Sequence, residues 1–448
     1  MLTVPSESQT DSQSARTAID QQIASALKDI SAAQIQRNIE TLVGFNTRQT
    51  LSAGMPGMQD GGIDAATDWI KGEFMRYSSQ CGDCMQVKTD QFIQPPAKRV
   101  PEAVTITNVY AILKGTDPAN AGRIYLVTGH YDSFNSDWTH VVGAAPGAND
   151  DASGTAVSLE CARVLSKHRF PATIIFLTVA GEEQGLLGSG HFAKMAKAVG
   201  WDIQGALNND IVGGDRTPGD TLRDPHLVRV FSEGIPSTAT PDEVKHALSL
   251  GYESDGPSRQ LARYVAETGK QYLAPADFQA MLVFRQDRFL RGGDHISFNE
   301  QGYPAVRLTE FRENYNHQHQ NVRTENGTEY GDLPKFVDYE YTANVARLNA
   351  ATLASLASAP APPLEVHLLT KALQNDSTLE WKPSPGGLAT SYEVVWRDTT
   401  APDWQHAQSV GNATQATLPV SKDNVIFGVR AVDVKGHRSV AVVPQPQR

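Results

Sequence analysis

The fold is decided by residues 172–183, which read ATIIFLTVAGEE. An apolar run of this length, ended by a glycine, predicts a strand that is buried on both faces. Residues 123–128 and a short run near 203–208 predict two more strands. Helical periodicity over 153–167 and 186–198 places helices between them. Alternating strands and helices predict an α/β domain with a mostly parallel central sheet flanked by helices.

Chemically active side chains follow these strands at their C-terminal ends or precede a helix. The candidates are His130, Asp132, Asp150, Asp151, Glu182, Glu183 and Asp210. Each has an ordinary structural alternative, because a lone histidine is more often a hydrogen-bonded core residue and paired acids often cap a helix. Those alternatives do not explain why the candidates share one edge of the sheet, where parallel sheets bind ligands.

The residue types at this edge indicate a metal centre. Imidazoles and carboxylates without a thiolate suit a hydrolytic zinc site with open positions. Two ions about 3.5–4 Å apart need a bridging carboxylate and about two further ligands each. The adjacent Glu182 and Glu183 can diverge at a strand end, so one can bind metal while the other takes a proton from water.

Composition narrows the function classes. The chain has 448 residues, a formal charge of −11 and 40% hydrophobic residues. This length suits two or three domains with sizeable cores. The negative charge argues against a nucleic-acid partner. The apolar runs have the length of strands, which is too short to span a membrane.

Ordered motifs carry a resemblance to a known family. They are HYD at 130–132, GANDDASG at 147–154, GEEQG at 181–185 and NND at 208–210, followed by GDHISF at 293–298. This set resembles the di-zinc aminopeptidase family, which includes bacterial leucyl aminopeptidases, glutamate carboxypeptidase and glutaminyl cyclases. The likeness covers about residues 30–356. It implies a zinc exopeptidase fold and a metallo-aminopeptidase that acts on the N-termini of peptides or proteins.

The resemblance also implies a metal-ligand set for two zinc ions. Asp150 would bridge the ions, and His130 and Asp210 would complete one position. Glu183 and a late histidine would complete the other position. The family further implies a cis peptide bond between Asp150 and Asp151.

The catalytic and supporting roles follow from the same likeness. Glu182 would be the general base, which takes a proton from the attacking water and delivers it to the leaving amine. Asp132 would orient the imidazole of His130. The residues expected to support the ligands or contact the substrate are Asp151, Asp294, His295 and Tyr315. Tyr315 would hold the oxyanion, unless it serves only in packing.

The late histidine has two candidates in the segment ENYNHQHQN at 313–321. The family usually has a Tyr-His-Thr pattern here, and we align His317 with its histidine. His319 is the alternative, because a slip of two residues along a strand keeps the side chain on the same face.

Other functions on the same fold remain open. A carboxypeptidase would need cations for the substrate carboxylate, and Arg285, Arg288 and Arg291 could supply them. A glutaminyl cyclase would use similar ligands with one zinc ion. A non-catalytic binding protein built on an inactive peptidase fold would have lost metal ligands or the base. A content near two zinc ions would therefore indicate the enzyme rather than the binding protein.

The domain organisation follows from composition. Residues 1–28 are polar and expected to be flexible, and residues 29–356 form the peptidase domain, with an insertion at about 215–290. A Pro/Ala linker at 357–363 leads to short alternating strands over 364–448, which predict a small β-sandwich. The last segment resembles a fibronectin type III domain, and it would contact a surface or polymer or cover part of the peptidase.

Localisation and specificity are expected from weaker features. The first 25 residues lack a signal peptide, yet the family and the appended module suit a secreted or periplasmic bacterial enzyme trimmed of its signal. Cys81 and Cys84 would form a short-range disulfide or remain free thiols. Phe134 and Trp138 offer an aromatic wall, which suggests apolar or aromatic first residues in the substrate.

Overall fold

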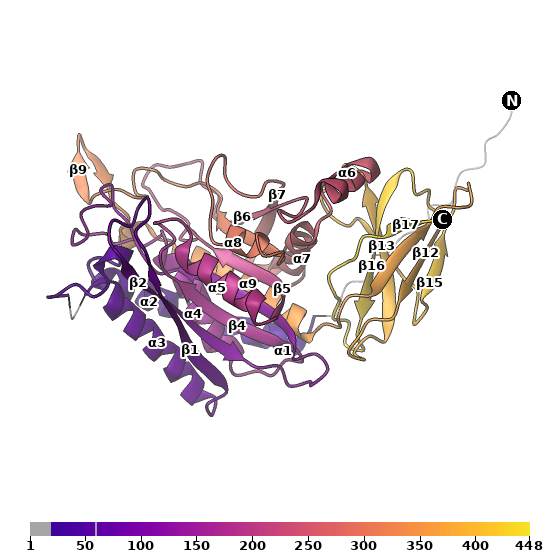
Figure 1. Cartoon of the computed structure of the whole chain (residues 1–448), viewed down its shortest axis with the longest axis horizontal. Helices are drawn as coiled ribbons and strands as arrows, with labels where there is room; N and C mark the ends of the chain where they lie inside the picture. The colour runs from indigo at the N-terminus through magenta and orange to yellow at the C-terminus, as the bar shows by residue number, and fades with distance from the viewer. Residues whose placement is uncertain (1–18, 59–60) are drawn as a thin grey trace. The chain divides into compact units, whose positions relative to one another are not determined.

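Eight strands of the described chain, all within the larger unit, Asp20–Ala359, form one sheet (Figure 1). The computed structural model describes residues 19–58 and 61–448. The strands of the sheet are β1 (Met85–Gln94), β2 (Val104–Leu113), β3 (Arg123–His130), β4 (Thr173–Val179), β5 (Asp202–Asn209), β6 (Leu227–Ser232), β7 (Gln279–Val283) and β8 (Ala305–Glu310). Their order in space is β1-β2-β4-β3-β5-β8-β6-β7.

The centre of this sheet is parallel and its margins are mixed. Strands β4, β3, β5 and β8 run parallel to their neighbours in that order. Antiparallel pairs join β1 to β2, β2 to β4 and β6 to β8, whereas β6 and β7 are parallel. Every residue of β3 and of β4 is buried, as their apolar runs predict. The structure confirms the α/β class with a parallel centre.

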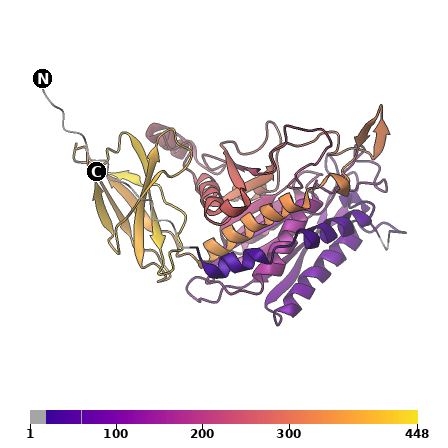
Figure 2. The ribbon, with the colours of Figure 1, turned by 180° about the vertical axis from the view of Figure 1, so that it is seen from behind.

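Helices cover both faces of the sheet. They are α1 (Gln21–Lys28), α2 (Ala32–Gly44), α3 (Gly62–Gln80), α4 (Ala152–Leu165), α5 (Leu187–Ala198), α6 (Pro241–Leu250), α7 (Pro257–Tyr272), α8 (His295–Asn299) and α9 (Tyr339–Ser358). Helices α5 and α8 lie on the face seen in Figure 1. Helices α4 and α9 pack together on the other face, where α9 is drawn in orange in Figure 2. A short hairpin, β9 (Arg323–Glu325) and β10 (Thr328–Tyr330), follows β8.

The register of the central strands places the site. Along β3 and β4, Ile124 pairs with Thr173 and His130 with Val179, so both strands end at the same level. The side chain of Asp151 caps α4 by accepting a hydrogen bond from the backbone N–H of Gly154 at 2.9 Å. The residues after β3, β4 and β5 therefore meet the start of α4 at one edge.

Two sequence-based boundaries need revision. The flexible segment expected for residues 1–28 includes α1, whose Ile23, Ala26 and Leu27 are buried, while residues 1–18 lie outside the described part of the chain. The segment 215–290, expected as an insertion, contributes β6 and β7 to the large sheet. Among the described residues, no helix has both the length and the apolar character that a bilayer crossing requires.

The smaller unit contains Pro360–Arg448 and is entirely β. Its strands are β11 (Leu364–Leu369), β12 (Ser377–Lys382), β13 (Ser391–Asp398), β14 (His406–Ser409), β15 (Gln415–Leu418), β16 (Val425–Val432) and β17 (Gln445–Gln447). They form two sheets, β15-β12-β11-β17 and β14-β13-β16. Side chains from both sheets, Trp381, Tyr392 and Phe427 among them, share one buried core. The unit thus has the two-sheet core of a sandwich.

Candidate metal centre

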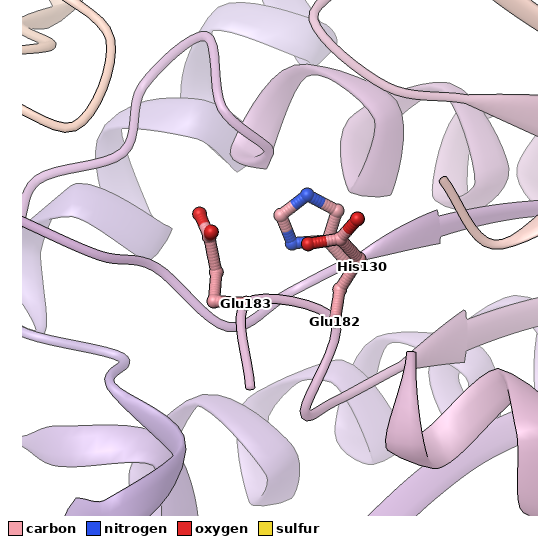
Figure 3. Close-up of side chains that lie close together, drawn as sticks. All are labelled: His130, Glu182 and Glu183. Carbon is pink, nitrogen blue, oxygen red and sulfur yellow. The ribbon is translucent and has the colours of Figure 1, made fainter. Parts of the chain in front are cut away.

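The strand ends bring the predicted ligands together. His130 ends β3, Glu182 and Glu183 follow β4, and Asp210 follows β5. Figure 3 shows His130, Glu182 and Glu183 converging from the ends of these strands. Three groups each have ligand atoms within 4.8 Å of one another, namely His130, Glu182 and Glu183; His130, Asp150 and Asp210; and Asp150, Glu183 and His319.

One side of the centre is built around His130. Its Nε2 lies 3.1 Å from Oδ1 of Asp150 and 3.9 Å from Oδ1 of Asp210. Its Nδ1 lies 3.1 Å from the backbone oxygen of Asp132 and 3.4 Å from a carboxylate oxygen of that residue. Nδ1 is thus occupied by Asp132, which leaves Nε2 to face the centre.

The other side is built around His319. Its Nε2 lies 2.9 Å from Oε1 of Glu183 and 3.0 Å from Oδ2 of Asp150. The two oxygens of Asp150 therefore face different histidines, Oδ1 toward His130 and Oδ2 toward His319. This is the arrangement that a bridging carboxylate needs. The peptide bond between Asp150 and Asp151 is cis, as the family likeness implies.

The structure places His319, and not His317, beside the predicted ligands Asp150 and Glu183. Nδ1 of His317 pairs with a carboxylate oxygen of Asp215, and its ring stacks on Phe336 with centroids 3.7 Å apart. The segment around it is a turn rather than a strand, and His319 has a φ of 56°. Residues two apart in such a turn do not share a face, so His319 reaches the centre and His317 points to Asp215.

Asp132 and Asp151 hold the backbone of the site. Oδ2 of Asp132 accepts hydrogen bonds from Thr50 Oγ1 at 3.0 Å and from the N–H of Glu183 at 3.2 Å. The carboxylate of Asp151 accepts from the N–H groups of His130 and Ile211 at 3.0 and 3.3 Å. Asp132 thus joins β3 to the Glu182–Glu183 segment, and Asp151 joins β3 to the loop after β5.

The remaining predicted residues lie at different depths. Asp294 is fully buried, and burial raises its pKa to about 7. His295 is also buried, its Nε2 lies 2.8 Å from the backbone oxygen of Gln286, and burial lowers its pKa to about 4. Tyr315 is 64% exposed.

Four residues that the sequence did not single out support the ligands. Asp332 accepts a hydrogen bond from the N–H of Asp150 at 2.7 Å, and Gln318 donates to Oδ2 of Asp150 at 2.9 Å. Arg48 is fully buried and donates to the backbone oxygens of Tyr131 and Gly147 at 2.7 and 2.8 Å. Arg307 lies 2.8 Å from the carboxylate of Asp210. Gln318 lies in the quoted segment 313–321, whereas Asp332, Arg48 and Arg307 belong to no quoted motif and are revealed only by the fold.

The electrostatics of the centre are those of crowded carboxylates. Burial opposes ionisation of Asp150, but His319 and His130 hold its pKa well below the ordinary value. Burial raises the pKa of Glu182 well above the ordinary value. Glu183 and Asp210 raise this pKa further, whereas His130 lowers it. Burial likewise raises the pKa of Asp151. Buried acids in excess over the two histidines favour a bound cation at this place.

These residues fit zinc. The donors are imidazole nitrogens and carboxylate oxygens without a thiolate, and each of the groups supplies three of them within reach of one ion. Three protein ligands leave a zinc ion a position for water or substrate, which is typical of catalytic zinc rather than structural zinc. His130 and Asp210 would hold one ion, Glu183 and His319 a second, and Asp150 both.

Substitution of the two late histidines tests this assignment. We expect His319→Ala to lower the affinity for one zinc ion by about 100-fold or more, because a direct ligand is lost. We expect His317→Ala to keep both ions and to lower thermal stability, because it leaves Asp215 without its buried partner. Zinc titration and thermal unfolding of both variants measure the difference. Loss of zinc in His317→Ala but not in His319→Ala would restore the original alignment.

Comparison with known proteins agrees with this centre. The model of peptidase family M28 matches residues 108–333, about half of the chain. A probable zinc metalloprotease of Leptosphaeria maculans is 46% identical over 96% of this chain and 98% of its own length. A probable zinc metalloprotease of Pyricularia oryzae is 45% identical over 95% of this chain and 85% of its own length. Since these relatives are fungal, the expected bacterial origin has no support.

Solved structures share the fold at lower identity. The LapA aminopeptidase of Legionella pneumophila aligns with a TM-score of 0.53 and 21% identity, and the match covers 76% of each chain. An aminopeptidase from Aneurinibacillus sp. strain AM-1 aligns with a TM-score of 0.50 and 17% identity over 76% of this chain and 96% of its own. Taken with the metal centre and the family match, these findings place the chain in peptidase family M28 as a zinc metallopeptidase.

Proposed function

We propose that the chain is an aminopeptidase that releases N-terminal residues from peptides, with two zinc ions and Glu182 as general base. The observation that carries this proposal is the state of Glu182. The ligands His130, Asp150, Glu183 and Asp210 are buried, whereas Glu182 is only half-buried. Among the described residues, no group donates a hydrogen bond to its carboxylate. That carboxylate is therefore free to accept a proton beside the ligands.

The reaction assigned to these residues is hydrolysis of the peptide bond after the first residue. Zinc held here would polarise the scissile carbonyl and lower the pKa of a bound water to about 7. Glu182 takes a proton from the attacking water as the carbon–oxygen bond forms. It then gives that proton to the leaving amine nitrogen as the carbon–nitrogen bond breaks. Burial, Glu183 and Asp210 raise the pKa of Glu182, which favours acceptance of a proton from the attacking water.

The arginines considered for a carboxypeptidase are already engaged. Arg288 Nη1 lies 2.8 Å and Arg291 Nη1 lies 3.3 Å from the same oxygen of Glu313, whose side chain is 3% exposed. Arg285 lies over the ring of Phe289 at 5.3 Å. A substrate carboxylate would have to displace Glu313 from two of these cations, which favours recognition of the N-terminus instead.

Three matched leucyl peptides and a glutaminyl peptide test the proposal and its alternatives. A leucyl peptide, its N-acetyl form and its C-terminal amide are incubated with the zinc-loaded chain, and the products are identified by mass spectrometry. An aminopeptidase releases leucine from the first and third and spares the second. Cleavage of the N-acetyl form at its C-terminus would indicate a carboxypeptidase. Pyroglutamate formation from a glutaminyl peptide, without hydrolysis, would indicate a cyclase.

Zinc affinity should rise with pH. Burial disfavours a charged imidazole, but Asp132 and Asp150 raise the pKa of His130 well above 6.5, and Glu183 and Asp150 do the same for His319. Both rings are therefore protonated in the metal-free chain near pH 6, and each must lose a proton to bind zinc. We expect affinity to increase by up to about tenfold per histidine and pH unit between about pH 6 and 8. Competition with a chromophoric chelator measures it, and pH-independent affinity would contradict the assignment.

Specificity and localisation belong to the same proposal. The ring of Phe134 meets that of His319 edge-on, with centroids 5.1 Å apart, which supports an apolar or aromatic first residue. The disulfide between Cys81 and Cys84 supports export to an oxidising compartment. The two-sheet core of the smaller unit supports the fibronectin type III likeness, and its role in surface or polymer contact stays a prediction.

A further inference from the structure

We propose that Arg307 is a positioning residue that fixes the carboxylate of Asp210 and thereby sets the affinity of the zinc position formed by His130 and Asp210. The inference rests on the ligand set of the proposed function. It concerns one of the two ions and predicts that Arg307 acts on that ion alone.

The first argument is that Arg307 pairs directly with Asp210. Arg307 Nη2 lies 2.8 Å from Oδ1 of Asp210, whereas His130 Nε2 lies 3.9 Å from the same atom, beyond hydrogen-bond distance. Arg307 makes an ion pair with this carboxylate, and its Nη2 also donates a hydrogen bond to the backbone oxygen of Asp210 at 3.5 Å. Asp150, by contrast, accepts a side-chain hydrogen bond from Gln318. The orientation of Asp210 therefore depends on the guanidinium group of Arg307.

The second argument is that Arg307 is itself held rigidly. Its side chain is completely buried on β8, where Arg307 pairs with Asn208 of β5 across the sheet. Nη1 donates to Oδ2 of Asp287 at 3.2 Å and to the backbone oxygen of Gly292 at 2.6 Å. Both contacts hold one end of the planar guanidinium group, Nη1, and so direct Nη2 toward Asp210, a geometry that a lysine cannot provide.

The third argument is that the loop before α8 passes close to the guanidinium group. A methyl group added at Gly293 would lie 2.7 Å from Arg307 Nη1 and 3.4 Å from Oδ2 of Asp210. The Gly292–Gly293 turn thus closes over the pair and leads directly into Asp294 and His295. Arg307 thus contacts both Asp210, which follows β5, and the loop before α8.

The consequence is selective. A residue that orients a metal ligand without touching the ion typically changes metal affinity by about 10–100-fold when substituted. Asp210 contributes to one ligand group and is absent from the group of Asp150, Glu183 and His319. Loss of the orientation should therefore weaken one zinc ion and leave the other unchanged.

The test is a zinc titration of the metal-free full-length chain with Arg307→Lys, which keeps the charge and loses the two-pronged geometry. We expect one ion to bind as in the wild type and the other about 10–100-fold more weakly. The visible spectrum of the cobalt-substituted chain should change for the weak position only. Unchanged binding of both ions, or equal weakening of both, would overturn the proposal.

A second variant answers the case in which Arg307→Lys does not fold. Gly293→Ala keeps Arg307 but crowds its Nη1, so it should reproduce the selective loss. Gly292→Ala is the matched control, because its added methyl group would meet only Cδ1 of Ile296, at 3.2 Å. Wild-type zinc binding in Gly293→Ala would also overturn the proposal. Because the readout is zinc alone, a wild-type chain that binds two ions but releases no leucine would defeat the proposed function and not this inference.

Discussion

Glu182→Gln should lower the rate of peptide hydrolysis about 10²–10⁴-fold while both zinc ions stay bound. The substitution keeps the shape of the side chain and removes the group that accepts the proton of the attacking water. General bases contribute about 10²–10⁴-fold, so kcat/KM for a leucyl peptide should fall by that factor. Glu182 belongs to one possible ligand group, with His130 and Glu183, but not to the two groups that share Asp150, to which the zinc ions are assigned, so zinc content should not change. The measurements are steady-state kinetics and metal analysis of the same preparation.

Glu183→Gln is the matched comparison, since the two glutamates are neighbours in the chain. Oε1 of Glu183 lies 2.9 Å from Nε2 of His319, and its loss should weaken one zinc ion as well as activity. The two roles would be reversed if Glu182→Gln lost zinc together with activity while Glu183→Gln lost activity and kept both zinc ions. Wild-type activity in Glu182→Gln would exclude it as the base.

Asp150→Asn should have the largest effect on metal binding. Its two oxygens face His130 at 3.1 Å and His319 at 3.0 Å, so both ions share this ligand. An amide oxygen is a weaker and uncharged donor, and its nitrogen cannot bind zinc. We expect both ions to lose about 100-fold or more in affinity, above the range for residues that only orient ligands. Hydrolysis should then be undetectable at ordinary zinc concentrations.

The neighbouring Asp151→Asn provides the control. Asp151 accepts hydrogen bonds from backbone N–H groups, including that of His130 at 3.0 Å, and it belongs to no ligand group among the described residues. The Asp151→Asn variant should have a lower thermal stability than the wild type and should retain two zinc ions. If Asp150→Asn still bound two ions with wild-type affinity, Asp150 would not be the bridge.

The sequence predicted the parts of the fold that local patterns specify. Strands β3 and β4 are buried on both faces, so their apolar runs could be recognised and their ends located. Strand β7 could not be recognised, because it is an edge strand whose residues stay partly or fully exposed. Helix α1 was missed because its apolar residues occupy one face of a short, otherwise polar segment.

The candidate site divides in the same way. Ligands that directly follow strands, such as His130 and Asp210, could be placed because parallel strands end at one edge. The last histidine could not be placed, because the sequence offers both His317 and His319. The left-handed backbone at His319 makes the two side chains point in different directions. Arg48, Arg307 and Asp332 come from segments far apart in the sequence, and only tertiary structure brings them to the ligands.

The most direct test of the central claim is a crystal structure of the zinc-loaded chain with anomalous diffraction data at the zinc edge. The account predicts two peaks about 3.5–4 Å apart. One peak should lie at His130 and Asp210, the other at Glu183 and His319, and Asp150 should bind both. A single peak, or a peak at His317 instead of His319, would contradict the two-ion centre derived from this fold.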